Sequence, residues 1–285
     1  MASFYNQANL SFGGRVTTSN VTEGEVVTRV TLTKTAVTTD YGEGDNIVYA
    51  INLVNSDSED KTNIIITDNL GAFITPSGIE VVPLNYVEGS ILYYRNGVLQ
   101  PAPVVVGGPP LVINGINIPA NGNVTLLYET RANEYAPRDI DGTIINNVTA
   151  VGEGICEDVS GSAEVPTRNE AILTIAKAIC PETVTCGEEV TYTFIIQNHG
   201  NLPVTATDNA IVSDVFNPVL TNITVRVDGN IISEGTGYTY NQVTGEFATI
   251  GGAITVPAAT FVLDPETGII ITTPGVTILT IAGMI

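Results

Sequence analysis

The sequence predicts an all-β chain of two tandem β-sandwich repeats, and three observations lead to this fold class. Its 28 Gly and 15 Pro among 285 residues, together with abundant Val, Ile and Thr, are typical of strands joined by turns. Apolar and polar residues alternate with a period of two along most segments. The same pattern also occurs twice, since Lys177 repeats Lys34 at a spacing of 143 residues (177 minus 34).

The repeat can be followed from the first strand of each copy onward. The strand at 30–34 matches 173–177, and the alternating segments after Gly44 and Gly187 match without a gap, ending at Asn55 and Asn198. Three further matches follow in the same order: 64–68 with 210–214, the turns at 95–97 and 227–229, and 123–127 with 275–279. Both copies are therefore predicted to be Ig-like β-sandwiches.

The two copies differ in phase. The first continues into strands near 143–151 and 158–165, for which the second has no counterpart, while residues 4–12 resemble 144–151 and residues 25–29 resemble 164–168. We therefore expect an N-terminal donor-strand segment at 1–28 and a first sandwich at 29–168. The second sandwich, at 169–285, is expected to lack its last strands.

A sandwich without its last strands exposes unpaired backbone groups. The N-terminal segment of another copy can fill the gap by donor-strand complementation, and repetition of this head-to-tail contact gives an open homopolymer. We favour this arrangement because few residues separate Thr28 from Thr31, as at the junction of the two repeats. The alternative is a monomeric surface adhesin or binding module closed by its own N-terminal strands.

Composition excludes several classes of function. Thirty acidic against ten basic residues give a formal net charge of −20, which disfavours nucleic-acid partners. The chain has one histidine, His199, in an expected turn, and it has no Walker, HExxH or paired CxxC motif. We therefore expect no enzymatic activity, no cofactor and no metal site. With no leader-like start and no long apolar run, we expect neither a signal peptide nor a membrane partner.

One family resemblance rests on a spaced motif present in both copies. Leu-x-Lys is followed by Gly-Asp/Glu-x-Val-x-Tyr-x-Ile-x-x-x-Asn, then Ile-x-x-x-Asp and Ile-x-Asn, and the pattern resembles the repeat domain of bacterial surface proteins called domain of unknown function eleven. More narrowly, the chain resembles the major subunits of ribbon-like appendages on clostridial endospores. The resemblance implies a structural spore-surface or extracellular fibre protein made in the mother cell, with copies of itself and other spore-surface proteins as partners.

Two sets of polar residues alternate with the apolar residues of their strands in such a way that their side chains should face the core. A buried lysine loses its charge readily, and with a carboxamide and a protonated acid it can form an isopeptide bond. Many Ig-like surface domains have such a set. The first set is Lys34, Asp68 and Asn146, and the second is Lys177, Asp214 and Asn6 of an incoming copy. The alternative is a Lys–Asp ion pair with a hydrogen-bonded Asn. Asn147 or Asn9 would take the place of Asn146 or Asn6 only if the strand register slipped by one residue.

The three cysteines do not have the spacing of a zinc site. Cys180 and Cys186 flank a five-residue segment in the second repeat, where the first has Val37 and Glu43. The sequence leaves open a Cys180–Cys186 disulfide, a bond from Cys156 to another copy, or free thiols.

Overall fold

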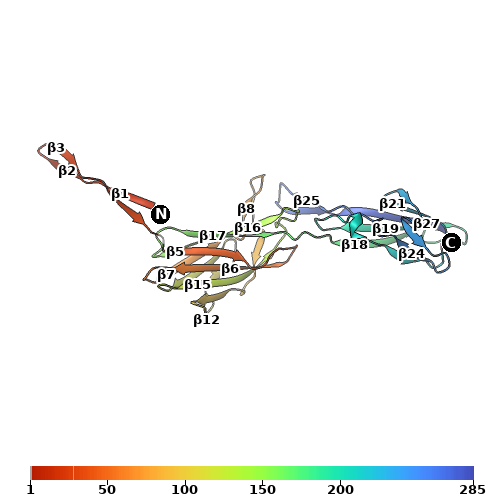
Figure 1. Ribbon diagram of the computed structural model, residues 1–285, viewed down its shortest axis with the longest axis horizontal. Coiled ribbons are helices and arrows are strands. Elements are labelled where there is room, and N and C mark those ends of the chain that lie inside the picture. The colour runs from red at the N-terminus through yellow and green to blue at the C-terminus, as the bar shows by residue number, and fades with distance from the viewer. Residues whose placement is uncertain (1, 28) are drawn as a thin grey trace. The chain divides into compact units, whose positions relative to one another are not determined.

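The computed structural model describes residues 2–27 and 29–285 and is almost entirely β (Figure 1). Its one described helix is the 3-10 turn η1 (Ala206–Asp208). The chain divides into two compact units: unit 1 runs to Pro137 and includes Thr143–Pro166, and unit 2 holds Arg138–Gly142 and Thr167–Ile285. The predicted fold class, all-β with two tandem sandwich units, is confirmed.

Two sheets form unit 1. The first has the strand order β12-β11-β15-β6-β5, with β10 also paired to β15, and the second has the order β13-β14-β7-β16-β17. The strands of the first sheet are β5 (Val30–Ala36), β6 (Asn46–Asn55), β10 (Leu84–Tyr86), β11 (Leu92–Arg95), β12 (Val98–Gln100) and β15 (Asn123–Ala132). The strands of the second are β7 (Lys61–Asp68), β13 (Val104–Val106), β14 (Leu111–Ile118), β16 (Thr143–Glu153) and β17 (Val159–Pro166), and a small hairpin joins β8 (Phe73–Ile74) and β9 (Glu80–Val81).

The core of unit 1 lies between these sheets. On β5 the burial alternates residue by residue, so that Val30, Leu32 and Lys34 face inward. β17 covers this strand closely: a Cβ on Gly161 would lie 2.7 Å from Leu32 Cδ2 and 3.2 Å from the backbone nitrogen of Lys34. A larger residue at this position would have to displace the Leu32 side chain and press on the Lys34 backbone, so glycine lets β17 lie close over β5.

Unit 2 repeats the five-strand path of the first sheet, without a separate counterpart of β10 among the described residues. Its order is β22-β21-β27-β19-β18, which matches unit 1 in sheet position and in chain order. The register also matches, because Lys34 pairs with Ile51 and Lys177 with Phe194 at the same offset of 143. The strands are β18 (Leu173–Cys180), β19 (Glu189–Asn198), β21 (Thr221–Val227), β22 (Asn230–Ile232) and β27 (Gly275–Met284).

The second sheet of unit 2 is shorter than its counterpart. It has the order β20-β24-β23, with β20 (Ser213–Val215), β23 (Tyr238–Tyr240) and β24 (Glu246–Thr249), and a separate hairpin joins β25 (Thr260–Leu263) to β26 (Ile270–Thr273). By position, β20 corresponds to β7, β24 to β14 and β23 to β13. Among the described residues of unit 2, no strand stands where β16 and β17 stand in unit 1.

The N-terminal residues form a long two-stranded hairpin (Figure 1). β1 (Ala2–Asn6) pairs with β4 (Thr22–Val26), and β2 (Asn9–Phe12) pairs with β3 (Arg15–Thr18). Gly13 and Gly14 form the turn, with φ angles of 57° and 79°. Positive φ at both residues is what a two-residue turn needs to match the right-handed twist of the strands. Of the expected donor segment 1–28, residues 1 and 28 lie outside the described residues.

Candidate functional site

Lys34 and Asp68 form a buried ion pair between the two sheets of unit 1. The Nζ–Oδ2 distance is 2.6 Å, and neither side chain is exposed to solvent. Lys34 comes from β5 and Asp68 from the end of β7. The alternation of apolar residues along both strands therefore carries these charged groups into the core, as the sequence predicts.

Two tyrosines, which the sequence alone did not indicate as site residues, lie next to this ion pair. Tyr128 on β15 donates its hydroxyl to the same Oδ2 atom of Asp68. Tyr49 pairs with Tyr128 across β6 and β15, and the Lys34 Nζ atom lies 4.8 Å from the Tyr49 ring centroid. Burial, followed by the charge of Asp68, raises the pKa of both phenols, so both hydroxyls keep their protons.

Burial also changes the protonation of Lys34. It lowers the pKa of the amine from 10.5 to about 8, although the Coulombic attraction and hydrogen bond of Asp68 raise the pKa in opposition. An exposed lysine is almost wholly protonated at pH 8, whereas about half of Lys34 is neutral at that pH. Only the neutral amine has the free electron pair that a nucleophile needs.

Asn146 on β16 supplies a buried carboxamide to the same core. Its Oδ1 atom accepts a hydrogen bond of 3.1 Å from the backbone N–H of Gly71, and its side chain is fully buried. Its Nδ2 atom is buried with no hydrogen-bond partner among the described residues. The carboxamide also lies close enough to Tyr49 and Tyr128 to lower the pKa of both phenols slightly, against the effect of burial. A donor on the carbonyl oxygen makes the carboxamide carbon more electrophilic, and a buried N–H donor without a well-aligned partner destabilises the unreacted state.

Unit 2 carries the equivalent lysine and acid in a more open setting. Lys177 contacts Asp214 Oδ2, but their side chains are 40% and 20% exposed. Lys177 lies on the core-facing side of its strand, with Nζ 5.4 Å from the ring centroid of the core residue Phe216, but β18 is exposed along its whole length because no strand among the described residues covers it. At the position of Tyr128, the register of β27 places Ile281, so Asp214 receives no phenol hydroxyl there.

The remaining member of the second set, Asn6, lies on the hairpin. It pairs with Thr22 and is exposed, on the same face as Phe4 and Gly24. The sequence match to β16 and β17 would pair Asn6 with Gly24, two residues away from the observed register. A shift of two residues keeps every side chain on its face, so the expected parity of Asn6 holds.

All three cysteines are exposed free thiols in the structure. Cys156 lies in the turn between β16 and β17, Cys180 ends β18, and Cys186 precedes β19. The cavity beside Cys156 has a volume of about 90 Å³ and is also lined by Val27, Arg29 and Val30.

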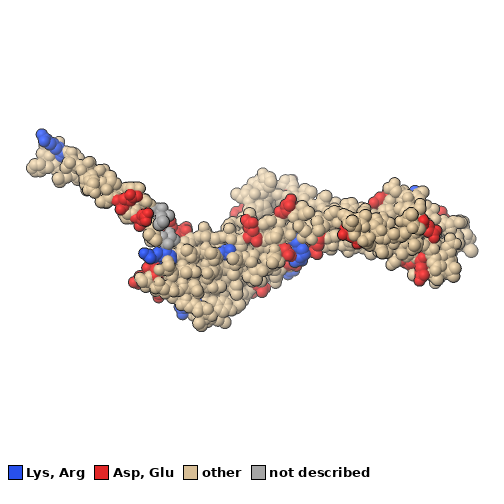
Figure 2. All heavy atoms as spheres, in the orientation of Figure 1, with Lys and Arg blue, Asp and Glu red and all other residues tan. Residues whose placement is uncertain are grey.

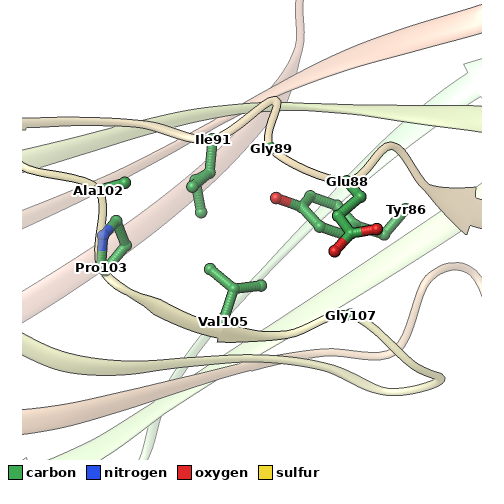
Figure 3. Close-up of a pocket in the computed structure, with 8 residues that line it drawn as sticks. All are labelled: Tyr86, Glu88, Gly89, Ile91, Ala102, Pro103, Val105 and Gly107. Carbon is green, nitrogen blue, oxygen red and sulfur yellow. The ribbon is translucent and has the colours of Figure 1, made fainter.

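A cavity of about 550 Å³ lies under the loops around β10, β11 and β13 in unit 1 (Figure 3). The figure shows the Glu88 carboxylate and the Tyr86 ring side by side, facing the apolar side chains of Ile91 and Val105. The lining has no nucleophile paired with a base, so it offers no catalytic arrangement of its own. Among residues 2–27 and 29–285, no three His, Cys, Asp or Glu side chains are grouped to hold a metal ion.

Acidic side chains are scattered over both units on the face drawn in Figure 2, with uncharged surface between them. Lys and Arg appear there only as isolated groups. Within the part of the chain that the structure describes, no helix is long and apolar enough to span a membrane.

No protein-family model matches the chain, and no match was found among curated proteins. Among solved structures, the chain is similar to the major pilin subunit of Bacillus cereus, with 11% identity over 96% of this chain and 73% of the pilin and a TM-score of 0.38. It is similar to a fragment of a major pilin of Streptococcus agalactiae, with 12% identity over 86% and 91% of the two chains and a TM-score of 0.35. It is also similar to the collagen-binding domain of a Staphylococcus aureus adhesin, with 14% identity over 50% and 100% and a TM-score of 0.30. Likeness at this level says nothing about function.

Proposed function

We propose that the chain is a structural subunit that polymerises head to tail into a surface fibre. In this assembly the N-terminal hairpin, residues 2–27, of one copy completes unit 2 of the next. One observation carries the proposal: β7 in unit 1 is paired on its outer edge by β16 and then β17, whereas the equivalent edge of β20 in unit 2 is unpaired among the described residues. The resemblance to surface repeat domains supports a location on a cell or spore surface.

The exposed side chains of β18 support the same proposal. Leu173, Ile175 and Ile179 are 45%, 56% and 37% exposed. Their counterparts at the start of β5, Val30 and Leu32, are only 2% and 8% exposed, because β17 covers them. A stripe of large apolar residues on a sheet edge favours association with another strand pair.

The hairpin has the properties of that strand pair. It carries exposed apolar side chains, among them Phe4 at 59%, Leu10 at 65% and Phe12 at 85%. Its strands pair only with one another in the described chain, and its sequence resembles that of β16 and β17. An isolated two-stranded hairpin is marginally stable at best, so insertion into an open sandwich would stabilise both partners.

We also propose that the buried polar sets become covalent bonds. In unit 1 the neutral Lys34 Nζ attacks Asn146 Cγ, an amide N–C bond forms, the Cγ–Nδ2 bond breaks, and the nitrogen leaves as ammonia with the one proton that the amine gives up. The Asp68 carboxylate accepts this proton from Nζ and passes it to Nδ2 while Tyr128 fixes its position. In unit 2, Lys177 and Asp214 would react in the same way with Asn6 of the incoming hairpin, which joins two copies.

The rate of bond formation in unit 1 should follow the charge of Lys34. Because the protonated amine is inert and its pKa is about 8, the rate should rise about tenfold between pH 7 and pH 9 and change little above that. Refolding at each pH, quenching and measuring intact mass would show the loss of one ammonia from unit 1. Asn146→Ala is the control and should lose no ammonia. If the mass of the unsubstituted chain stays unchanged after prolonged refolding, no isopeptide bond forms and Lys34 and Asp68 make only an ion pair.

Removal of residues 1–28 tests the assembly itself. The shortened chain should keep its β-sheet circular dichroism but form no filaments in electron microscopy, because it has no donor strands. A peptide of residues 1–28 should then bind the shortened chain in a one-to-one ratio, and the resulting complex should not grow into filaments. Filaments that persist without the hairpin, or an intact chain that stays monomeric at every concentration, would contradict the proposal.

A further inference from the structure

We infer that each junction between two copies is closed by a disulfide from Cys156 of the donor copy to Cys186 of the acceptor copy. The inference rests on the proposed head-to-tail assembly and adds a second, redox-sensitive link to it. It follows from where the three exposed thiols lie relative to the ends of the two sandwiches.

The first step locates the base of the donor hairpin in the acceptor. In unit 1 the covering strand β17 ends at Pro166, whose carbonyl accepts a hydrogen bond of 3.1 Å from the N–H of Tyr41. At the repeat offset of 143, Tyr41 corresponds to Val184 in unit 2. The sequence match of the hairpin makes Val27 the counterpart of Pro166, and the observed register, with Asn6 in the place of Asn146, makes Glu25 that counterpart. Val27 of the donor should therefore lie beside Val184 of the acceptor or two residues, about 7 Å, beyond it.

The second step brings the thiols to this contact. Val184 lies two residues before Cys186 and four after Cys180, and an extended chain covers about 7 Å in two residues. On the donor side, Val27 and Cys156 line the same small cavity at the start of unit 1. One cysteine from each copy thus meets at the same junction, on surfaces that are exposed in the single chain.

The distribution of cysteines supports an inter-copy bond over an intra-chain one. Unit 1 has Val37 and Glu43 where unit 2 has Cys180 and Cys186, and the hairpin has Gly13 and Gly14 where unit 1 has the turn that holds Cys156. In the proposed assembly, these cysteine-free positions would belong to the connection between the two repeats of one chain, and the positions that carry thiols would belong to the contact between two copies.

The chemistry needs an oxidant, for which a small-molecule disulfide such as glutathione disulfide suffices. The two protein thiols lose two electrons and two protons and form one S–S bond, while the small disulfide is reduced to two thiols. Thiols held at one junction meet at an effective concentration of about 1 mM. At about 10 μM protein, the bond should therefore form about 100-fold faster in filaments than between unassembled chains.

Two single-cysteine chains test the inference. One keeps only Cys156, with Cys180→Ser and Cys186→Ser, and the other keeps only Cys186, with Cys156→Ser and Cys180→Ser. Mixed, assembled and treated with glutathione disulfide, they should give a mixed dimer on a denaturing gel that a reductant separates, and peptide mapping should join Cys156 to Cys186. A chain that keeps only Cys180 is the matched control and should give much less mixed dimer.

The outcomes separate this inference from the assembly on which it rests. Three results would overturn the disulfide without contradicting the fibre. They are intact filaments without a mixed dimer, a preferred bond to Cys180, and a Cys180–Cys186 bond within one unsubstituted chain. If no filaments form from the unsubstituted protein, the proposed function fails first. Reductant sensitivity distinguishes the disulfide from an isopeptide bond, which a reductant does not cleave.

Discussion

Asp68→Ala should destabilise unit 1 by about 3–5 kcal/mol, because it leaves Lys34 in a dry core without the partner that stabilises its charge there. Lys34 would then share a fully desolvated core with the Tyr128 hydroxyl, which also loses its acceptor. Denaturant unfolding followed by tyrosine fluorescence measures this loss. Comparison in an Asn146→Ala background, which cannot cross-link, isolates the contribution of the ion pair.

Asp57→Ala is the matched control for that substitution. Asp57 also pairs with a lysine, Lys61, at 2.8 Å, and the Lys61 side chain is nearly buried, but the Asp57 side chain is 29% exposed to water, so its removal should cost clearly less stability than that of Asp68. With Asn146 present, Asp68→Ala should in addition lose no ammonia on folding, whereas Asp57→Ala should react as the unsubstituted chain does. Ammonia loss from Asp68→Ala would show that the carboxyl is not needed for the bond.

Ile175→Asp should abolish filament growth while leaving the single chain as stable as before. Ile175 is 56% exposed on β18, so a carboxylate there is hydrated in the free chain. In the assembly it would occupy the place of Leu32, under the covering strand, and burying an unpaired carboxylate costs several kcal/mol. The critical concentration for assembly, measured by sedimentation, should therefore rise by at least about 100-fold.

Ile231→Asp provides the comparison for this edge. Ile231 is 63% exposed on β22, the opposite edge of the same sheet, where unit 1 has no covering strand either. It should leave the critical concentration almost unchanged. Equal effects of the two substitutions would mean that added charge, rather than the β18 edge, controls association.

The repeat and its register could be read from the sequence because period-two alternation and turn residues are local signals. The turns Asn96-Gly97 and Asp228-Gly229 both have positive φ at each position, as two-residue hairpin turns require. Asn55 and Asn198, matched from the motif alone, are both buried and donate their side-chain amides to carbonyls of the loops beside them. Such positions are set by a local pattern and survive in both units.

The environment of the site could not be read in the same way. Tyr128 on a core-facing position is typical of ordinary packing, and its contact with Asp68 depends on how two sheets stack, which no local pattern fixes. The openness of Lys177 has the same origin, since parity predicts the face of a strand but not whether another strand covers that face. The sequence thus predicts which residues could meet, and tertiary packing decides how dry their surroundings are.

The place of Lys34 and Asn146 in the fold has a mechanical consequence. Tension along a fibre would enter unit 1 at β5, its first strand, and leave at β17, which is paired directly to β16. A bond from Lys34 to Asn146 would carry the pull from β5 straight to β16 and bypass every residue between them. The sheets would then bear almost none of the load, and the fibre would behave as an inextensible cord whose sandwiches stay folded while it is stretched.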